Sequence, residues 1–398
     1  MRILFIGFWG VNDPLTTSTT MPNLQILQGI STVEVIVFAT VERNTDDDMS
    51  FNPAFEGNKI VFKPLISRTN QSLLLNKLDD FLRFPRELTS LVKEYKIDTI
   101  IGRGVMAGAL AYQTSKKTGV RFFVESFEPH ADYMLDSGVW KSYDPRYIFQ
   151  SRWEEKEKKL AEGIMPVAEN YRRKLIEEGV PADKIMTVSC FVNLDAFAFN
   201  SKNREYMRQK LGLQDDTVVG IYVGKFGDIY YDMEAFELFK AASDYFLDRF
   251  QLIILTPNPL EEVRAKLKQV GLNESNTFVT KAPHNEVPAY LSAADFAFAP
   301  IKPADCRQYC SPVKVGEYWA SGLPVILTEG VGDDSKIIQE EGGGAIFNLE
   351  RHNSVNEAIQ QIDTMIHIDG YRDQVRRIAE KHRSIQQAEK AYAKFFGN

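Results

Sequence analysis

The feature that most constrains this chain is an alternation of short apolar runs with longer amphipathic segments, which occurs in two successive series. Strands and helices in strict alternation are typical of a parallel sheet that is covered on both faces. The first series of predicted strands is 3–7, 33–39, 99–102, 121–125 and 163–167, and predicted helices include 71–95 and 106–118. The second series is 218–223, 251–256, 277–280, 296–300 and 324–328. The sequence therefore predicts an α/β fold with two Rossmann-like, doubly wound parallel sheets.

The length agrees with two domains, because 398 residues exceed the size at which one hydrophobic core stops growing. Periodicity lapses near 193–203, where Asn, Asp and Ser gather. We predict an N-terminal domain over 1–197 and a C-terminal domain over 198–372. The helical segment 373–398 either crosses back onto the first domain or packs only on the second. Sheets of this type bind ligands at their carboxyl edges, so we expect a cleft between the two edges.

Composition excludes several classes of protein. A formal net charge of −7 argues against a nucleic-acid partner held by bulk electrostatics. Cys190, Cys306 and Cys310 are too few for a disulfide framework, and they lack the spacing of a zinc site. The apolar run 3–7 is too short for a signal peptide, and no stretch approaches the roughly 20 apolar residues of a membrane helix. We therefore expect a cytoplasmic protein without a structural metal.

The segment 311–326 gives the strongest indication of chemistry. Ser311 is a favourable helix cap, Pro312 is a favourable first helical residue, and Gly322 is a favoured residue at a helix end. The backbone amides that begin such a helix, including that of Val313, form a site for an anion such as a diphosphate.

Two charged side chains strengthen this interpretation. Lys314 lies in the first turn and adds a positive charge, and Glu317 lies one turn further on nearly the same face. A carboxylate in that place can accept two hydrogen bonds from a ribose diol. The alternative is a surface helix in which Glu317 simply pairs with Lys314.

A second candidate turn follows the predicted strand 218–223. Gly224 and Gly227 permit close approach of the backbone, and Lys225 offers a point charge to a phosphate. A plain turn between a strand and a helix is the alternative.

The pattern Ser311-Pro312-x-Lys314-x-x-Glu317-Tyr318-x-Ala320-x-Gly322-x-Pro324-Val325 resembles the donor-binding signature of family-four retaining glycosyltransferases of the GT-B fold. It is especially similar to the branch that builds capsule and lipopolysaccharide chains in bacteria. The resemblance implies two Rossmann-like domains that face across a cleft. It also implies a metal-independent hexosyltransferase that needs no cofactor and transfers a sugar with retention in bacterial surface glycan synthesis.

The resemblance has two gaps. In the family a second Glu stands eight residues before the helix Glu and contacts the donor sugar; here 317 − 8 = 309, and that residue is Tyr309. The family also often has another Lys about five positions after the first, whereas this chain has Ile-Tyr-Tyr at 229–231. Nucleotide binding is therefore predicted more firmly than the identity of the sugar.

The resemblance assigns further residues. Backbone groups near Lys281 are expected to read the base, His284 is interpreted as a loop histidine, and 330–333 as a turn. In the first domain, Arg103 is a further candidate for the cleft, and Gly7 and Gly10 close the first strand where the family's first loop meets donor or acceptor.

The catalytic candidates follow the strand 121–125. Glu125, Glu128 and His130 are candidates for a base or for binding acceptor hydroxyls, although Glu128 and His130 can instead pair with each other. The acidic run 46–48 is interpreted as a solvated loop rather than a metal site.

These observations predict a UDP- or GDP-linked sugar donor and a glycan or lipid-linked acceptor, with contact to the inner face of the membrane left open. One alternative is a nucleotide-sugar epimerase, and another is a non-catalytic nucleotide-sugar-binding subunit of a glycan-assembly complex. A dehydrogenase is less favoured, because the glycine fingerprint is incomplete and no acidic residue ends the predicted strand 33–39.

Overall fold

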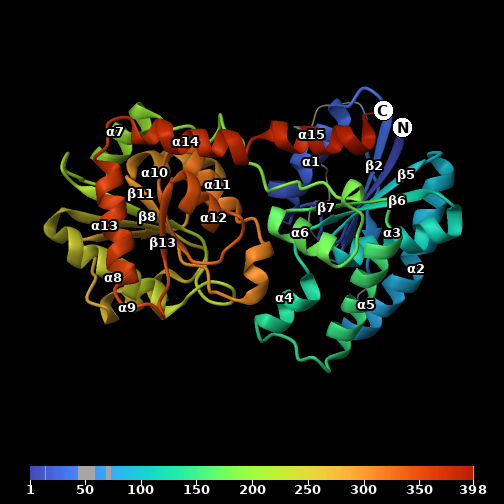
Figure 1. Ribbon diagram of the computed structural model, residues 1–398, viewed down its shortest axis with the longest axis horizontal. Helices are drawn as coiled ribbons and strands as arrows, with labels where there is room; N and C mark the ends of the chain where they lie inside the picture. Colours follow the sequence, from blue (N-terminus) through green and yellow to red (C-terminus); the bar gives the residue numbers. More distant parts are fainter. Residues whose placement is uncertain (14, 44–58, 69–72, 398) are drawn as a thin grey trace. The chain divides into compact units, whose positions relative to one another are not determined.

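The structure, a computed structural model, describes residues 1–13, 15–43, 59–68 and 73–397 (Figure 1). The acidic run 46–48 lies outside the described residues. The chain forms two compact units: unit 1 is Met1–Ser189 together with Gln386–Asn398, and unit 2 is Cys190–Ile385. None of the helices in the described ranges is both long enough and apolar enough to cross a membrane.

Unit 1 is built on a parallel sheet. Its strands are β1 (Arg2–Gly7), β2 (Val35–Glu42), β3 (Ile60–Phe62), β4 (Leu65–Ile66), β5 (Thr99–Arg103), β6 (Arg121–Ser126) and β7 (Gly163–Pro166). They lie in the order β3-β2-β1-β5-β6-β7, and β4 pairs with the end of β2. The strand order therefore reverses between β1 and β5. Each strand of the first predicted series is present, and β3 and β4 are additional.

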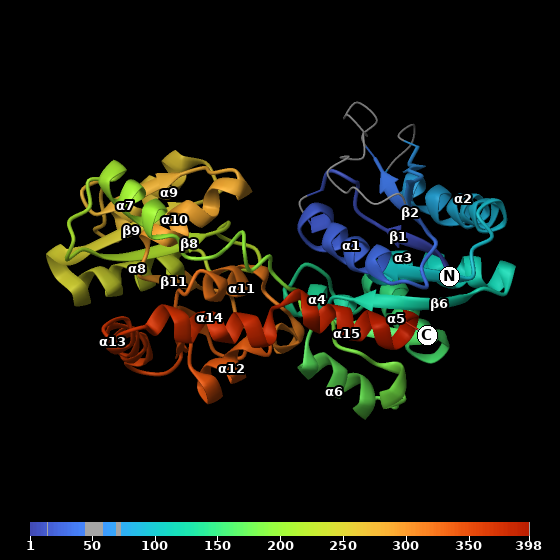
Figure 2. The same ribbon diagram turned by 90° about the horizontal axis from the view of Figure 1, so that it is seen from above.

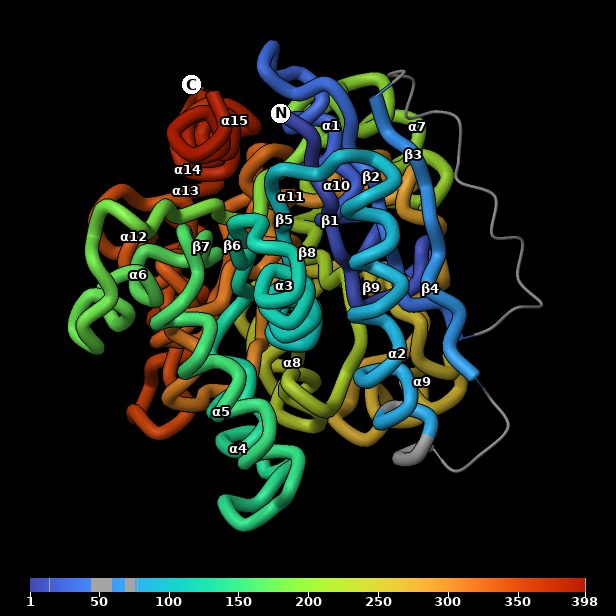
Figure 3. Tube along the Cα trace, turned by 90° about the vertical axis from the view of Figure 1, so that its right-hand side faces the viewer, coloured from blue at the N-terminus to red at the C-terminus, as the bar shows by residue number. Residues whose placement is uncertain are grey.

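Burial explains why these runs form central strands. Ile3, Leu4, Phe5 and Ile6 are all completely buried, so both faces of β1 are covered. The helical elements of this part of the chain are η1 (Thr16–Thr20), α1 (Met21–Gly29), α2 (Leu73–Glu94), α3 (Val105–Thr118), α4 (His130–Asp136), α5 (Pro145–Leu160), α6 (Glu169–Glu177) and η2 (Ala182–Lys184). The helix α3 packs against α2 and α5, and Figure 3 shows these three helices on the same side of unit 1.

The C-terminal segment is two helices with a break at Arg383 and Ser384. The first, α14 (Tyr371–His382), belongs to unit 2, and most of the second, α15 (Ile385–Phe396), belongs to unit 1. The rings of Phe395 and Phe396 lie 5.5 and 4.9 Å from the ring of Phe123 on β6. Of the two packings that the sequence left open, the last helix therefore takes the one on the first sheet.

Unit 2 is built on a second parallel sheet. Its strands are β8 (Val218–Val223), β9 (Phe250–Leu255), β10 (Thr277–Thr280), β11 (Phe296–Ala299), β12 (Val325–Thr328) and β13 (Gly344–Phe347). They lie in the order β10-β9-β8-β11-β12-β13, so the order reverses between β8 and β11. The predicted fold class, with two doubly wound parallel sheets, is confirmed. The point of reversal is where sheets of this type bind ligands.

The helices of unit 2 cover both faces of this sheet. They are α7 (Ser201–Lys210), α8 (Met233–Phe246), η3 (Leu247–Arg249), α9 (Leu260–Gln269), η4 (His284–Glu286), α10 (Val287–Ala293), η5 (Asp305–Tyr309), α11 (Val313–Ala320), α12 (Asp334–Glu341), α13 (Ser354–Ile366) and α14. Alternate residues of each strand enter different cores: Ile221 packs with α10, α11 and α14, whereas Tyr222 packs with α8 and α13. Figures 1 and 2 both place α14 beside α11.

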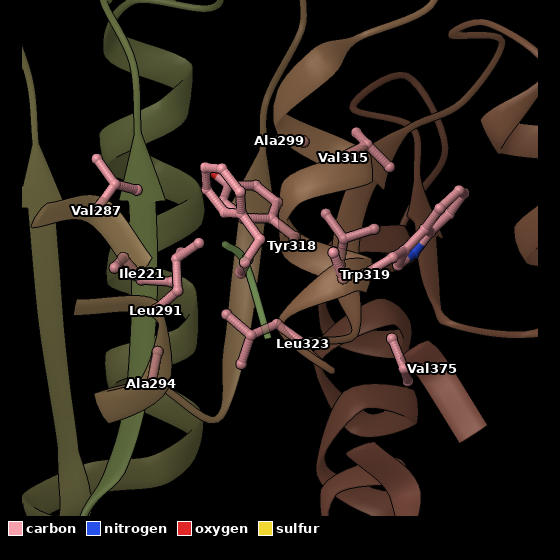
Figure 4. Packing of buried hydrophobic residues seen from close by; sticks show 14 of the residues in the cluster. Ile221, Val287, Leu291, Ala294, Ala299, Val315, Tyr318, Trp319, Leu323 and Val375 are labelled. Atoms are coloured by element: carbon pink, nitrogen blue, oxygen red, sulfur yellow. The ribbon is translucent and has the colours of Figure 1, made fainter. Parts of the chain in front are cut away.

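The helix α11 is anchored by two large, completely buried side chains, Tyr318 and Trp319. Figure 4 shows their rings pointing in opposite directions from the helix. The Tyr318 hydroxyl accepts a hydrogen bond of 2.9 Å from the amide of Val223, and the Trp319 indole donates one of 2.8 Å to the carbonyl of Gly343. Truncating a buried aromatic residue of this size costs about 3–5 kcal/mol. The sheet thus holds α11 firmly behind the loop after β8.

Candidate functional site

Loops from three neighbouring strands meet at the carboxyl edge of the sheet in unit 2. The loop after β8 approaches α11 at Gly224, whose added Cβ would lie 2.5 Å from Lys314 Nζ. The loop after β12 approaches the segment before α11, because the Gly332 amide donates a 2.9 Å hydrogen bond to the carbonyl of Arg307. A Cβ at Gly332 would lie 2.7 Å from the carbonyl oxygen of Cys310. The turn at 330–333 therefore packs against residues 307–310, the segment that leads into α11.

The start of α11 differs from the prediction in its cap. Pro312 is the N-cap residue, Val313 is the first helical residue, and no side chain caps the helix. The Ser311 hydroxyl instead accepts hydrogen bonds from the amide of Cys190, at 3.1 Å, and from the guanidinium of Arg383. The capping role predicted for Ser311 is therefore wrong, because these two donors engage the hydroxyl. The amides that begin α11 have no side-chain cap.

The end of α11 agrees with the prediction. The helix ends at Ala320, and Gly322 follows with φ of 69°, a conformation that favours glycine. The amide of Leu323 then donates a 2.9 Å hydrogen bond back to the carbonyl of Tyr318.

Lys314 provides the most unusual electrostatic feature of the site. Its Nζ is buried and has no hydrogen-bond partner among the described residues. The nitrogen lies 4.0 Å from the ring centroid of Tyr230 and 4.8 Å from that of Tyr222. Burial lowers the pKa of Lys314 to about 7, although the charge of Glu317 acts in the opposite direction. Gly224, with φ of 146°, leaves the room that this ammonium group occupies.

Glu317 lies one turn further along α11 and is 7% exposed. Its Oε1 is 2.9 Å from Nε2 of His284, which belongs to η4 after β10. This hydrogen bond raises the pKa of His284. Among the described residues Glu317 forms no ion pair with Lys314, so the surface pair considered as an alternative is absent. The sequence gave no functional role to His284; the available signal was a histidine in a loop at the same sheet edge as Glu317.

Lys225 lies at the carboxyl end of β8 but is held within its own loop. Its Nζ is 2.7 Å from Oδ2 of Asp228, and both side chains are largely exposed. The Tyr222 hydroxyl donates to the Lys225 carbonyl, and the amide of Phe226 donates a 3.0 Å hydrogen bond to Asn258 Oδ1. The structure thus places Lys225 at the predicted edge, with its charge already partly neutralised.

Two other predicted positions lie in neighbouring loops. Lys281 is exposed after β10, and its carbonyl accepts a 3.2 Å hydrogen bond from the hydroxyl of Thr280. Tyr309, at the position of the family's sugar-contacting Glu, is half-buried at the end of η5. Arg307, two residues earlier, is 2% exposed and was not singled out from the sequence. Its carbonyl holds the loop after β12, so it helps to shape the site.

A buried ion pair lies behind the start of α11. Arg383 binds both Ser311 and the carboxylate of Asp334, which begins α12. A Cβ on Gly316 would lie 3.3 Å from Cγ of Arg383, so the guanidinium stem packs directly against α11. Burial raises the pKa of Asp334 to about 6, although Arg383 acts to lower it. This network fixes the segment 311–316.

In unit 1, Arg103 and Glu125 are paired across the neighbouring strands β5 and β6, and β5 borders the reversal of strand order. Arg103 ends β5, and its guanidinium forms an ion pair with Oε2 of Glu125. The same oxygen accepts a 3.1 Å hydrogen bond from Asn23, and Oε1 accepts one from the hydroxyl of Tyr392 on α15. Glu125 is 3% exposed and Arg103 is 5% exposed. The structure therefore brings these two predicted residues together in an internally paired cluster.

Gly7 and Gly10 lie at the end of β1 and in the loop that follows. A Cβ at Gly10 would lie 2.7 Å from Oε2 of Glu42, whose Oε1 accepts a 2.8 Å hydrogen bond from the amide of Val11. The strand β2 extends to Glu42, so an acidic residue does end it. That part of the argument against a dehydrogenase is wrong; the incomplete glycine fingerprint remains.

Glu128 and His130 form a pair where β6 leads into α4. Oε1 of Glu128 is 3.2 Å from Nδ1 of His130. Burial acts to lower the pKa of His130, but the hydrogen bond and charge of Glu128 outweigh it, and the pKa is raised. The structure thus shows the mutual pairing of Glu128 and His130 that the sequence left open. A role of either residue as a catalytic base stays a prediction.

Comparison with known proteins extends these observations. Residues 218–366 match the family model described as Glycosyl transferases group 1. No curated protein sequence matches the chain.

Similar solved structures cover nearly the whole chain. Sucrose-phosphate synthase from Thermosynechococcus elongatus is 15% identical, covers 100% of this chain and 98% of its own, and has a TM-score of 0.74. HepE from Anabaena in complex with UDP-glucose is 13% identical over 99% of each chain, with a TM-score of 0.70. WaaG, a glycosyltransferase involved in lipopolysaccharide biosynthesis, is 14% identical over 100% of each chain, with a TM-score of 0.66. The chain thus shares its fold with glycosyltransferases, and residues 218–366, which include α11, match the group 1 glycosyl transferase family.

Proposed function

We propose that this chain is a glycosyltransferase that binds a nucleotide diphosphate sugar at the carboxyl edge of the sheet in unit 2. The observation that carries the proposal is Lys314, a buried ammonium group without a hydrogen-bond partner among the described residues. Burying an uncompensated charge is costly, so a protein that keeps one has a reason to do so. A diphosphate is the anion that this position suits, because Lys314 lies in the first turn of α11, whose opening amides have no side-chain cap.

The same groups give a mechanism. Negative charge develops on the diphosphate as the bond to the sugar breaks, and Lys314 with the α11 amides stabilises that charge. Glu317 accepts hydrogen bonds from the ribose hydroxyls one turn further along the helix. We propose a metal-independent reaction, because fixed positive groups of the chain supply the charge that the leaving group needs.

Lys314 also accounts for a gap in the resemblance. The position about five residues after Lys225, where the family often has a second Lys, is Tyr230 in this chain. The ring of Tyr230 lies 4.0 Å from Lys314 Nζ. We infer that Lys314 on α11 supplies the charge that the second Lys supplies in the family. Its ammonium group lies beside Tyr230, which occupies the position of that Lys in the loop after β8.

We propose a hydroxyl acceptor on a glycan or a lipid-linked glycan, with retention and a role in bacterial surface glycan synthesis. The support is the family resemblance of the motif at 311–325, together with the fold shared with WaaG. In unit 1, the Glu128–His130 pair is the better candidate to receive the acceptor proton, because Glu125 is occupied by Arg103, Asn23 and Tyr392.

Contact with the inner face of the membrane is proposed through an exposed patch on α2 and α5. The patch is defined as Leu78, Leu82, Phe149, Arg152 and Lys156. The two helices meet where the ring of Phe81 lies 5.2 Å from that of Phe149. Leu82 is 69% exposed and Leu78 is 48% exposed, and the two exposed cations form no ion pair with any described residue. Lys156 Nζ does lie 4.3 Å from the ring centroid of Trp153, but neither cation has a carboxylate partner among the described residues. Apolar side chains flanked by such cations suit an anionic lipid surface.

Vesicle binding tests this patch. The chain is expected to co-sediment with vesicles that contain phosphatidylglycerol and not with pure phosphatidylcholine vesicles, and Leu82→Glu with Lys156→Glu should abolish binding. Unchanged sedimentation of that double variant would refute the patch.

The proposed function is tested by titrating the full chain with UDP and GDP and by assaying product from UDP- and GDP-linked hexoses with a glycan acceptor. HepE was solved with UDP-glucose, so UDP-glucose is the first donor to test. Transfer to the acceptor is the expected result. Conversion of the donor to its epimer without acceptor would indicate an epimerase, and nucleotide binding without any product would indicate a binding subunit.

A further inference from the structure

The contact between His284 and Glu317 joins two elements that are 33 residues apart in the chain. His284 belongs to η4 after β10, whereas Glu317 lies within α11. The side chain of Glu317 is 10% exposed, and that of His284 is 66% exposed. The imidazole thus forms the solvent-facing side of an otherwise buried carboxylate.

Stability alone gives little reason for this contact. Ion pairs and hydrogen bonds of a largely exposed side chain contribute little to stability, because water competes with the partner and the side chain loses freedom. An exposed histidine nevertheless contacts Glu317, the carboxylate to which the proposed function assigns the ribose.

The imidazole ring is held from a second side. Its centroid lies 5.4 Å from the ring of Phe197, and Phe197 is 4% exposed. The carbonyl of Phe197 accepts a 2.8 Å hydrogen bond from the hydroxyl of Ser321, which directly follows α11. The surroundings of His284 are therefore tied to the same helix that carries Glu317.

The hydrogen bond from His284 engages only one of the two oxygens of the Glu317 carboxylate. Oε1 lies 2.9 Å from His284 Nε2, and no described residue forms a hydrogen bond with Oε2. A carboxylate has about four acceptor positions, so fixing one oxygen leaves the other free for a diol.

We propose that His284 is a positioning residue of the nucleotide site. Its Nε2–H donates to Oε1 of Glu317 and fixes the carboxylate so that Oε2 receives the ribose hydroxyls. This inference rests on the proposed function, because it requires a nucleotide in the site. It adds a residue from the loop after β10 to the recognition of the ribose.

The experiment compares UDP with 2′,3′-dideoxy-UDP, which lacks both ribose hydroxyls, by calorimetric titration of the full chain. His284→Ala is expected to weaken UDP binding about tenfold, the effect of losing a well-placed hydrogen bond to a charged group. Binding of dideoxy-UDP is expected to change less than about twofold, since that ligand makes no use of Glu317. His284→Gln, which keeps an N–H donor at a similar reach, should restore most of the UDP affinity.

His382→Ala is the matched control, because His382 Nε2 also lies 2.9 Å from a glutamate oxygen, that of Glu341, elsewhere in unit 2. It should leave both affinities unchanged. An equal loss for UDP and dideoxy-UDP in His284→Ala, or no loss for either, would overturn the positioning role. Failure of the unaltered chain to bind UDP or GDP would instead refute the proposed function and this inference with it. Thermal unfolding of each variant separates a folding defect from these outcomes.

Discussion

In each unit a buried cation lies near the point where the strand order of the sheet reverses. The two cations differ in whether a carboxylate of the chain pairs with them. In unit 1, Arg103 pairs with Glu125, and Asn23 and Tyr392 donate further hydrogen bonds to the same carboxylate. In unit 2, the Nζ atom of Lys314 is also buried, yet no described residue forms a hydrogen bond with it.

The difference separates a charge with a structural role from a charge that we propose serves to bind a ligand. A buried ion pair that is supported by further hydrogen bonds is a stable part of the fold, and removing one partner is costly. The Arg103–Glu125 pair is of this kind, although Arg103 Nε has no hydrogen-bond partner among the described residues. A buried cation without a partner weakens the fold until an anion arrives. In unit 1 the cation therefore stabilises the fold, including α15. In unit 2 we propose that the cation is available to a ligand.

The largest expected effect concerns the paired cation. Arg103→Met should lower the free energy of unfolding by about 3–5 kcal/mol, because Glu125 would remain buried without its counter-charge. Denaturation in urea measures the change. The double variant Arg103→Met with Glu125→Gln should recover a large part of the loss; no recovery would show that the pair does not act as a unit.

Replacing the unpaired cation, Lys314, should reduce ligand affinity without reducing stability. Lys314→Met is expected to weaken UDP binding about 100-fold, as the loss of a charge-assisted hydrogen bond of ~2–3 kcal/mol predicts. Its free energy of unfolding without ligand should be equal to or greater than that of the unaltered chain. Calorimetric titration and urea denaturation give both values, and Lys268→Met on the exposed surface of α9 is the control. If Lys314→Met is less stable but binds UDP normally, Lys314 has a structural role and does not bind the ligand.

The pH dependence of the free energy of unfolding gives a second test of the buried, unpaired Lys314. Burial lowers the pKa of Lys314 to about 7 in the folded chain, well below its value in the unfolded chain. Between pH 7 and about 10.4 the unfolded chain therefore binds one more proton than the folded chain. Over that window the free energy of unfolding should rise by about 1.4 kcal/mol per pH unit relative to Lys314→Met. Parallel curves for the two proteins would contradict the assignment.

The smallest effect is expected at Lys225. Its charge is exposed and pairs with Asp228, so Lys225→Ala should weaken UDP binding by only about threefold, in line with exposed ion pairs of below ~1 kcal/mol. The same titration measures it. A loss as large as that of Lys314→Met would move the phosphate site to the loop after β8.

The sequence predicted those features that depend on neighbours along the chain. The apolar runs predicted both sheets, and Gly322 predicted the end of α11, because hydrophobic periodicity and backbone preference can be read from neighbouring residues. The role of Ser311 was missed because its partners, Cys190 and Arg383, are 121 and 72 residues away. The end of β2 at Glu42 was missed because β4 pairs with Val41 and Glu42 and extends the strand.

Some contacts of the candidate site could be predicted for the same reason. Lys314 and Glu317 share a helix, and the 3.6-residue period placed them together. The burial of Lys314 Nζ depends on Tyr222, Tyr230 and Gly224, which come from a different strand and its loop. The contact of His284 with Glu317 likewise depends on the sheet order, which brings the loop after β10 to the same edge as α11.

The most direct test of the central claim, that Lys314 awaits a diphosphate, is the number of protons taken up when UDP binds at pH 8. Titration calorimetry in two buffers of different ionisation enthalpy gives this number. The unaltered chain should take up close to one proton, because the bound anion restores the charge of Lys314, and Lys314→Met should take up none. Equal proton uptake by the two proteins, or none by either, would contradict the claim.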